Sequence, residues 1–305
     1  MFPSALCIRI SVSQNAVLKN KRRKIYLRAG FSGERPSPGN VAPYKIYRPA
    51  TEHSAPETPG QCWFGESVSE NIELCESQTI LPSLLKYLPR NGRILESGCG
   101  LGRWVFYLKR KGFDISGIDL SQSAIDAAKA YDSAAPIQLD DVLHSEFPDA
   151  SFDAVISLGV VEHFEQGPSQ ALAELHRLLK DGGLLFISVP INNLFRVTFV
   201  NPLKDLRRFC RARNGASVEF EEYRFTKNAF ERYLAAANFE VLETVPDDFL
   251  PPKNLGLYAD LRFFWSPTRK WELNPLGNIV NAVLRSISPW MACAGALWIC
   301  RKRSS

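Results

Sequence analysis

The 305-residue sequence predicts an α/β fold in which helices surround a mainly parallel sheet. From about residue 76, short apolar runs alternate with stretches of helical periodicity, as in successive βα units. A glycine-rich turn joins the first apolar run to a helix, and acidic residues or a glycine follow the next three runs. Ligands of open α/β sheets bind at the carboxyl ends of the strands. The same pattern therefore predicts the fold class and the position of a ligand site.

Local patterns place the elements of this region in order. Helices are expected where apolar residues recur with helical spacing, and strands where short apolar runs are bounded by polar residues or glycine. We expect helices over residues 77–88, 104–111, 121–131 and 169–179, and strands over residues 93–96, 114–119, 137–140, 152–158 and 184–189. The segment Lys180-Asp181-Gly182-Gly183 is expected to form the turn before the last of these strands.

Beyond Pro190 this alternation breaks down. Residues 191–223 carry aromatic and basic residues and are expected to form an inserted segment. A helix opened by Thr226 and a strand over 239–245 follow, and then a long aromatic-rich connection over 247–289. Residues 289–300 are apolar but fall well short of the ~20 residues that span a bilayer. We expect residues 294–300 to form the last, buried strand of the sheet.

The formal net charge of +5 is unevenly distributed along the chain. Residues 1–50 contain ten Lys or Arg and a single acid, Glu34. We therefore expect residues 1–60 to form a basic, partly disordered extension and residues 61–303 to form the folded domain. Because the basic excess belongs to the extension, no specific nucleic-acid partner is indicated.

Cysteine usage and the start of the chain bear on location. The seven cysteines include no C-x-x-C pair, which indicates a reducing compartment. Arg9 interrupts the apolar start and argues against a secretory signal, although an organelle transit peptide stays open. The expected location is cytoplasmic.

The segment Ile94-Leu95-Glu96-Ser97-Gly98-Cys99-Gly100-Leu101-Gly102 is the most informative in the chain. Glycines at alternate positions allow a sharp turn and a close backbone approach to a ligand, and the next helix points its N-terminal amides the same way. A dinucleotide fingerprint would have its third glycine at position 103, where this chain has Arg103. The spacing argues against a pyrophosphate and for a different nucleotide-like ligand.

Polar residues at the next strand ends suit the rest of such a ligand. Asp119 ends the second strand, where a carboxylate can accept hydrogen bonds from both hydroxyls of a ribose. Asp141 follows the third strand and can take an adenine amino group, although Asp140 competes for that role. Leu158 and Gly159 follow the fourth strand.

Four motifs in order carry a family resemblance. "ILESGCGLG", "GIDLS", "FPDASFDAVISLGVVEHF" and "LLKDGGLLFISVP" resemble the motifs of class I S-adenosylmethionine-dependent methyltransferases, in the group that includes ubiquinone-biosynthesis-type enzymes. The resemblance covers residues 76–190 strongly and residues 220–303 more weakly. It implies a Rossmann-like sheet of seven mostly parallel strands, with the antiparallel last strand next to the fifth and helices on both faces. Residues 76–190 would form the cofactor half, and 191–223 and 247–289 would cap the acceptor.

The resemblance also implies S-adenosyl-L-methionine as cofactor and assigns roles by position. Glu96 and the backbone of the glycine loop would hold the methionine end, Asp119 the ribose, and the residues after the second and third strands the adenine. Leu158 and Gly159 would line the wall beside the methyl group. The full cofactor set is Glu96, Gly98, Gly100, Gly102, Asp119, Leu120, Asp141, Val142, Leu158 and Gly159.

His163 is the candidate catalytic residue. Methyl transfer from a sulfonium is an in-line displacement whose rate depends mainly on positioning. A hydroxyl acceptor also needs a base, and histidine titrates near neutrality. A structural histidine at a helix start is an equal alternative. Some ubiquinone-type relatives bind a divalent metal through E-x-x-E-H, but Gly159 replaces the first acid here, so no metal is predicted.

The predicted function is methyl transfer from S-adenosylmethionine to a small-molecule, glycan or lipid-linked acceptor, most readily at oxygen. The alternatives are an NAD-dependent oxidoreductase on a Rossmann-like fold and a non-catalytic adaptor that keeps the fold. Residues 203–213 are rich in Lys and Arg and suit either an interfacial amphipathic helix or a solvated basic helix. Peripheral membrane contact is therefore an option.

Overall fold

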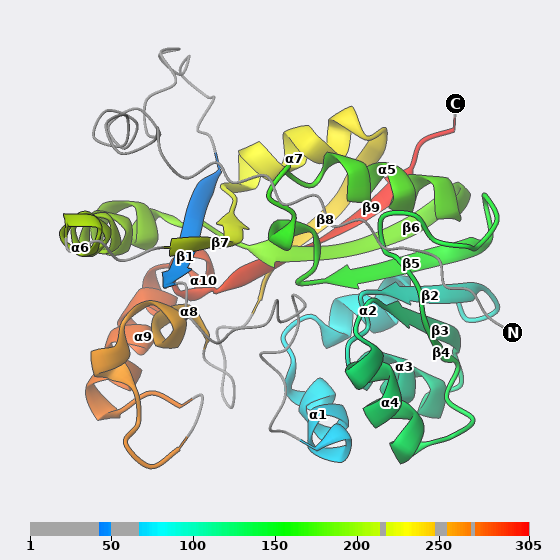
Figure 1. Ribbon diagram of the computed structural model, residues 1–305, viewed down its shortest axis with the longest axis horizontal. Helices are drawn as coiled ribbons and strands as arrows, with labels where there is room; N and C mark the ends of the chain where they lie inside the picture. The colour runs from blue at the N-terminus through cyan, green and yellow to red at the C-terminus, as the bar shows by residue number, and fades with distance from the viewer. Residues whose placement is uncertain (1–42, 50–66, 214–217, 248–254, 270–271, 305) are drawn as a thin grey trace, which may run out of the picture. The chain divides into compact units, whose positions relative to one another are not determined.

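A seven-stranded sheet forms the centre of the computed structural model, which describes residues 43–49, 67–213, 218–247, 255–269 and 272–304. Its strand order is β4-β3-β2-β5-β6-β9-β8 (Figure 1). The strands are β2 (Arg93–Ser97), β3 (Asp114–Asp119), β4 (Ile137–Leu139), β5 (Phe152–Leu158), β6 (Leu179–Pro190), β8 (Phe239–Asp247) and β9 (Gly295–Lys302). Strands β2 to β6 pair in parallel, and β9 runs antiparallel to both β6 and β8. The predicted sheet, with its antiparallel last strand next to the fifth, is confirmed.

Helices cover both faces of this sheet. Ile94 packs into a core with α2 (Leu81–Tyr87), α3 (Arg103–Arg110) and α4 (Gln122–Tyr131), whereas the next residue, Leu95, packs into a second core with α5 (Ser169–Leu178) and α7 (Lys227–Ala236). Successive side chains of a strand point to opposite faces, so neighbouring residues of β2 serve two different cores. Figure 1 shows the two groups of helices on opposite sides of the sheet.

Two local boundaries differ from the expected ones. The expected helix over 77–88 is confined to α2, with Pro82 in its first turn, because proline lacks the N–H that a helix interior needs. Before α2 the chain forms α1 (Val68–Glu73) and a short 3₁₀ turn, Leu74–Ser77. The expected 180–183 turn lies within β6, since Phe152 pairs with Leu179 and Ala154 with Leu184, leaving the four residues between as an irregularity in the ladder.

The two predicted cap segments have structure of their own. The first contains a π-helical turn, Arg196–Val200, then α6 (Asn201–Arg213) and β7 (Val218–Arg224). The second contains α8 (Leu255–Asp260), a 3₁₀ turn at Arg262–Phe264 and α9 (Pro275–Ile287), followed by α10 (Pro289–Ala292). Leu257, Phe264 and Leu284 form a small core against which Phe195 of the first segment packs. We call residues 191–224 and 255–292 the cap.

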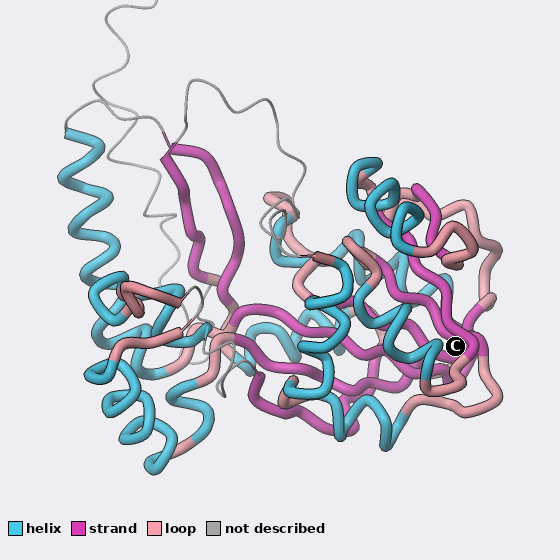
Figure 2. The backbone as a smooth tube through the Cα atoms, turned by 90° about the horizontal axis from the view of Figure 1, so that it is seen from below, coloured by secondary structure: helices cyan, strands magenta, loops and turns pink. Residues whose placement is uncertain are grey.

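A second, two-stranded sheet joins the cap to an earlier part of the chain. β1 (Tyr44–Pro49) pairs antiparallel with β7, and Figure 2 shows the pair as a ribbon apart from the main sheet. β1 lies inside the range 1–60 that we assigned to the extension, and residues 1–42 lie outside the described residues. The division at residue 60 stays a prediction.

A buried ion cluster holds the cap elements to one another. The Asp260 carboxylate, 1% exposed, accepts hydrogen bonds from Arg196 Nε at 2.6 Å, Arg224 NH1 at 2.5 Å and Lys204 Nζ at 2.9 Å. Burial alone would raise the pKa of Asp260, but the three cations hold it well below its usual range. Since these cations come from three different elements, one carboxylate links α8 to the remainder of the cap.

Candidate functional site

A pocket opens at the carboxyl ends of β2, β3 and β5, where the sequence predicted a ligand site. Its walls combine the glycine loop, the start of α3, the residues that follow β3, and the loop after β5. The lining residues are Asn71, Glu96, Gly98, Cys99, Gly100, Leu101, Arg103, Trp104, Asp119, Leu120, Ser121, Ala124, Val142, Leu158, Gly159, Val160, His163 and Phe164.

The three glycines of the loop have different roles. All three have positive φ, at 80°, 51° and 74° for Gly98, Gly100 and Gly102, which favours glycine. A Cβ at Gly98 would lie 2.4 Å from a Val160 methyl, and one at Gly102 would lie 2.2 Å from Ile137 Cδ1. A Cβ at Gly100 would meet nothing within 4 Å. Gly98 and Gly102 therefore allow close packing, while Gly100 leaves an open side of the backbone at the pocket.

Asp119 is held in place by main-chain amides. Its Oδ2 accepts a hydrogen bond from Gly100 N–H at 2.7 Å, and its Oδ1 accepts one from Ser121 N–H at 2.8 Å. Each carboxylate oxygen can accept a further hydrogen bond. The carboxylate therefore faces the pocket in a fixed orientation and can receive two adjacent hydroxyl groups.

Glu96 lies beneath the loop, 3% exposed. Burial raises its pKa to about 8, although nearby Arg103 and a hydrogen bond from Val105 N–H at 3.2 Å favour the charged form. A cationic group of a ligand beside this carboxyl would lower the pKa and receive a charged partner. The site therefore suits a positively charged ligand end.

Two further polar side chains at this end of the pocket were missed from the sequence. Asn71 of α1 lines the pocket and is 2% exposed. Trp104 Nε1 is buried with no hydrogen-bond partner among the described residues. The signal for α1 was present as Ser67-x-x-Glu70, which forms a capping box in the structure. The indole N–H of Trp104 is a donor that a bound ligand could satisfy.

The other end of the pocket is apolar. Leu120, 47% exposed, lies here with Ala124 and Val142, which come from the two chain segments after β3 and β4. An exposed leucine beside two buried apolar residues forms a surface that a flat heteroaromatic ring could cover. The pocket thus runs from a charged end at Glu96, past Asp119, to this apolar end.

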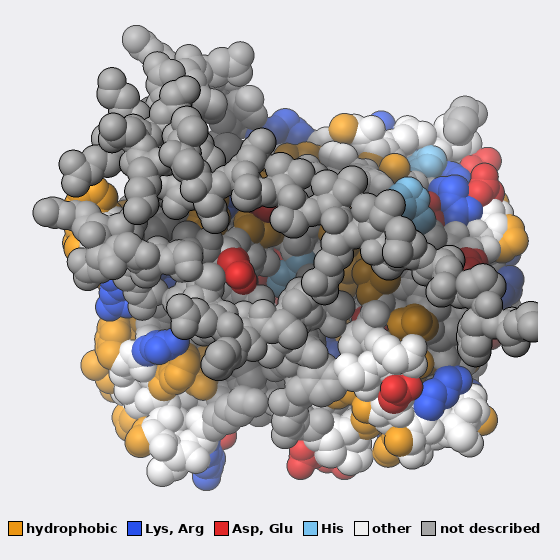
Figure 3. Space-filling model, in the orientation of Figure 1, with side chains coloured by type: hydrophobic (Ala, Val, Ile, Leu, Met, Phe, Trp, Pro, Cys, Tyr) orange, Lys and Arg blue, Asp and Glu red, His pale blue; other side chains and the backbone are white. Residues whose placement is uncertain are grey.

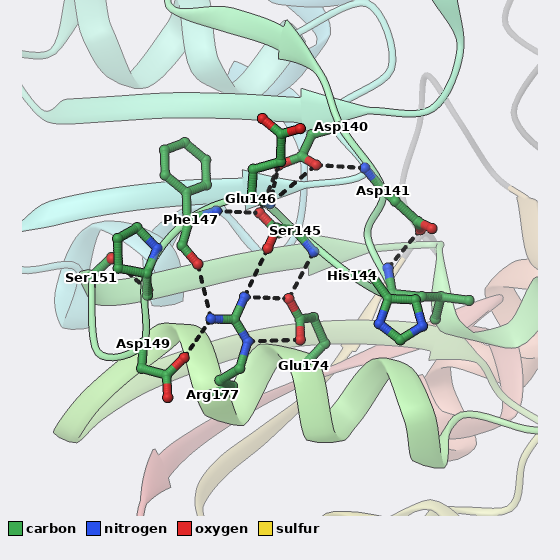
Figure 4. Close-up of polar contacts among 12 residues, drawn as sticks. Asp140, Asp141, His144, Ser145, Glu146, Phe147, Asp149, Ser151, Glu174 and Arg177 are labelled. Atoms are coloured by element: carbon green, nitrogen blue, oxygen red, sulfur yellow. Dashed lines mark hydrogen bonds and ion pairs between the residues drawn. The ribbon is translucent and has the colours of Figure 1, made fainter.

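The loop after β4 carries two adjacent acids whose carboxylates make different hydrogen bonds, and neither lines the pocket (Figure 4). Asp140, 9% exposed, accepts hydrogen bonds from Ser145 Oγ at 2.7 Å and from Asp141 N–H at 2.8 Å. Asp141 accepts only a local hydrogen bond, from Leu143 N–H at 2.8 Å, among those described. Asp140 therefore shapes the loop, and Asp141 is the acid whose carboxylate is less engaged.

Arg177 of α5 braces the same loop from below. Its guanidinium binds Glu174 through two hydrogen bonds, at 2.6 and 2.9 Å, and Asp149 at 2.6 Å. Glu174 in turn accepts a hydrogen bond from Ser145 N–H at 2.8 Å. Figure 4 shows these side chains converging under the loop that carries Val142 into the pocket. An isolated surface ion pair contributes little to stability. These ion pairs are connected to buried hydrogen bonds, so they help to hold the loop in place.

His163 reaches the pocket from a 3₁₀ turn, Val161–His163, after β5. Its Nδ1 lies 2.9 Å from the carbonyl oxygen of Glu221 in β7. The nearby Tyr223 hydroxyl donates to the carbonyl of Glu165 at 2.7 Å. With Nδ1–H donating to that carbonyl, Nε2 carries the lone pair. β7 therefore orients the ring so that its second nitrogen is a proton acceptor.

Two acids adjust the protonation of this histidine. Burial lowers the pKa of His163. The charges of Glu162 and Glu222 and the hydrogen bond to the Glu221 carbonyl together raise it by more than burial lowers it, so the pKa lies above its usual value. Burial raises the pKa of Glu162 to about 7, and its Oε2 has no partner among the described residues. Within the part of the chain that the structure describes, no group of three His, Cys, Asp or Glu could hold a metal ion.

Nine of the eleven predicted site residues line one pocket. The two that do not are Gly102, which packs against Ile137, and Asp141, which immediately precedes Val142 in the loop after β4. The structure thus brings together the glycine loop, the acid after β3, the residues after β5 and His163.

Comparison with known proteins gives independent evidence on the class of protein. Residues 95–187 match a family model described as a methyltransferase domain. The chain is 34% identical over 115 residues to a ubiquinone biosynthesis O-methyltransferase of Xylella fastidiosa, covering 35% of this chain and 46% of that protein. It is 28% identical over 148 residues to an S-adenosyl-L-methionine-dependent Diels-Alderase of Talaromyces variabilis, covering 46% of this chain and 49% of that protein. The chain thus spans about half the length of these curated relatives.

A solved structure shares the fold. A SAM-dependent methyltransferase from Methanosarcina mazei superposes with a TM-score of 0.53 at 19% identity, covering 73% of this chain and 98% of that one. The match over residues 95–187 and these relatives support the class I S-adenosylmethionine-dependent methyltransferase family. The family and the fold imply S-adenosyl-L-methionine as the cofactor.

Proposed function

We propose that this protein transfers a methyl group from S-adenosylmethionine to a hydroxyl of a small-molecule, glycan or lipid-linked acceptor. The observation that carries the proposal is the convergence of Asp119, the glycine loop and His163 on one pocket. The Asp119 carboxylate would accept hydrogen bonds from a ribose. His163, in the loop after β5, would supply a proton acceptor on that wall of the pocket.

The residues present fit the cofactor in the chemistry of their side chains. Glu96 would hold the ammonium of the methionine part, beside the open backbone at Gly100. Asp119 would accept from the ribose hydroxyls, and Leu120 and Val142 would enclose the adenine. Asp141 is not among the lining residues, and its contact with the amino group stays a prediction. When bound, the cofactor supplies a methyl group on a positively charged sulfur. Leu158 and Gly159 would line the wall beside it.

His163 would take the proton of the acceptor hydroxyl at Nε2. The hydrogen bond from Nδ1–H to the Glu221 carbonyl holds the tautomer and the ring plane during this step. Glu162 and Glu222 favour the imidazolium that forms, since their charges raise the pKa of His163. The chain thus positions the acceptor oxygen and removes its proton, which are the two contributions that displacement at a methyl group requires.

The acceptor would lie between the loop after β5 and the cap. β7 belongs to the cap and contacts the loop through both Glu221 and Tyr223, so the reacting end of the pocket borders the elements outside the common methyltransferase motifs. These elements would determine which acceptor is used. The O-methyltransferase among the relatives is consistent with an oxygen nucleophile.

The first test is ligand binding by the purified full chain. Calorimetric titration should show binding of S-adenosylmethionine and S-adenosylhomocysteine and none of NAD. Binding of NAD without S-adenosylmethionine would overturn the proposal in favour of an oxidoreductase.

The second test is turnover. Release of S-adenosylhomocysteine should be measured with panels of phenols, sugars and isoprenoid-linked hydroxyl compounds, and the methylated product identified by mass spectrometry. Cofactor binding with no methylated product from any panel would contradict methyl transfer and favour a role that uses the bound cofactor otherwise.

A further inference from the structure

Exposed apolar side chains are concentrated at the cap. Of the fifteen large hydrophobic side chains exposed among the described residues, twelve lie between residues 191 and 289. Scattered exposed apolar residues are ordinary, but such a concentration in one part of a fold indicates an interaction surface. The pocket described above accounts for none of the twelve.

Helix α9 presents a continuous apolar stripe. Leu276, Ile279, Val283 and Ile287 recur at helical spacing and are 57%, 62%, 54% and 64% exposed. The opposite side of α9 is already used, since Gly277, Asn281 and Leu284 are buried against the cap core. The stripe is therefore a second apolar face of the helix, and more than half of each of its side chains is exposed among the described residues.

The turn before α6 and α6 itself carry another stripe. Phe199, Leu203 and Leu206 recur at helical spacing and are 66%, 36% and 59% exposed. Lys204, between them in sequence, reaches the buried Asp260, so α6 is held against the cap by a different face. Figures 1 and 2 both place α6 and α9 at the same end of the main sheet, away from β3 and β4.

Charge distinguishes this end from the cofactor half. Residues 191–213 contain six Lys or Arg, of which Arg196 and Lys204 bind the buried Asp260, and one acid, whereas residues 51–190 contain ten Lys or Arg and twenty acids. Figure 3 shows blue basic side chains beside orange apolar ones in the region of α9. The α6 stripe thus lies in a basic segment, and α9 carries one Arg and no acid.

We propose that the cap docks on a lipid bilayer that contains anionic headgroups, with the stripes of α9 and α6 entering the boundary between headgroups and acyl chains. Amphipathic helices with Phe, Leu and Ile on one face and Arg nearby bind bilayers in this way. A second copy of the chain fits less well, because a two-fold interface through these stripes would bring two segments together in which Lys and Arg outnumber acids.

Docking is independent of methyl transfer and is tested by binding alone. The full chain should float with vesicles of phosphatidylcholine and phosphatidylglycerol several-fold more than with phosphatidylcholine alone, and high salt should reduce this difference. Val283→Glu should weaken partitioning by about tenfold, because it places a charge where an apolar group enters the boundary. Ala282→Glu is the matched control, because it adds the same charge at an exposed position of α9 outside the stripe. It should weaken partitioning much less.

Thermal unfolding of both variants shows whether loss of fold explains a weaker binding, and Leu206→Glu provides a second stripe variant. The proposal is overturned if the chain floats with neither vesicle, or if Val283→Glu and Ala282→Glu weaken binding equally. It is also overturned if light scattering shows a dimer that Val283→Glu dissociates, since a second copy would then cover the stripe. Each result stands whether or not an acceptor is methylated.

Discussion

Asp119→Ala removes the side chain on which ribose recognition is proposed to depend. In the structure its two oxygens each accept one main-chain hydrogen bond, from Gly100 and Ser121, and each retains capacity for a ribose hydroxyl. Hydrogen bonds to a charged group contribute about 1.5–3 kcal/mol each. Water can partly replace the lost carboxylate, so we expect Asp119→Ala to reduce the binding free energy by about 2–4 kcal/mol, which raises Kd roughly 30- to 1,000-fold.

The assay is calorimetric titration of S-adenosylhomocysteine into the wild-type and variant chains. Asp126→Ala is the matched control, because Asp126 is an exposed acid on α4 and its loss changes the net charge equally. Circular dichroism and thermal unfolding should show that Asp119→Ala remains folded. If the folded variant binds within about twofold of wild type, while Asp126→Ala behaves identically, Asp119 has no part in cofactor recognition.

Four further outcomes are expected. His163→Ala should lower turnover of a hydroxyl acceptor by about 10²–10⁴-fold with an unchanged cofactor Kd, and equal losses of both would indicate a structural histidine. Because the neutral imidazole is the base and its pKa is raised above 6.5, wild-type turnover should fall as pH drops through that pKa, and His163→Ala should lose this limb of the profile. Gly98→Ala should lower Tm, since the new Cβ would lie 2.4 Å from a Val160 methyl, and a Tm at the wild-type value would contradict the packing. Asp260→Ala should destabilise the chain by about 3–5 kcal/mol in denaturant unfolding, because three cations around it lose their buried partner; an effect under about 1 kcal/mol would show the cluster to be unimportant.

The glycine loop shows how far local sequence carried the prediction. The spacing of Gly98, Gly100 and Gly102 after a short strand predicted a backbone that turns sharply toward a ligand, and all three have positive φ. The sequence could not separate the roles of the three glycines, because whether a Cβ would clash depends on which distant residue packs against each of them. Val160 and Ile137 come from other parts of the chain, and only Gly100 is open at the pocket.

The cap shows where local sequence was insufficient. Residues 247–289 were expected to be an aromatic-rich connection, yet they contain α8 and α9 with a core of their own. α9 has apolar residues on two faces, so its periodicity alone does not say which face is buried. Packing against Phe264 and Leu273 buries Gly277 and leaves Val283 outside.

The sequence by itself determined the βα order, the sheet class and the cofactor half, because strand and helix periodicities and the glycine turn are set by neighbouring residues. Tertiary structure alone decided what surrounds the reacting end. His163 is oriented by a carbonyl 58 residues away, and Asp260 gathers cations from three elements. Contacts between distant segments depend on how whole elements pack, and no local pattern encodes them.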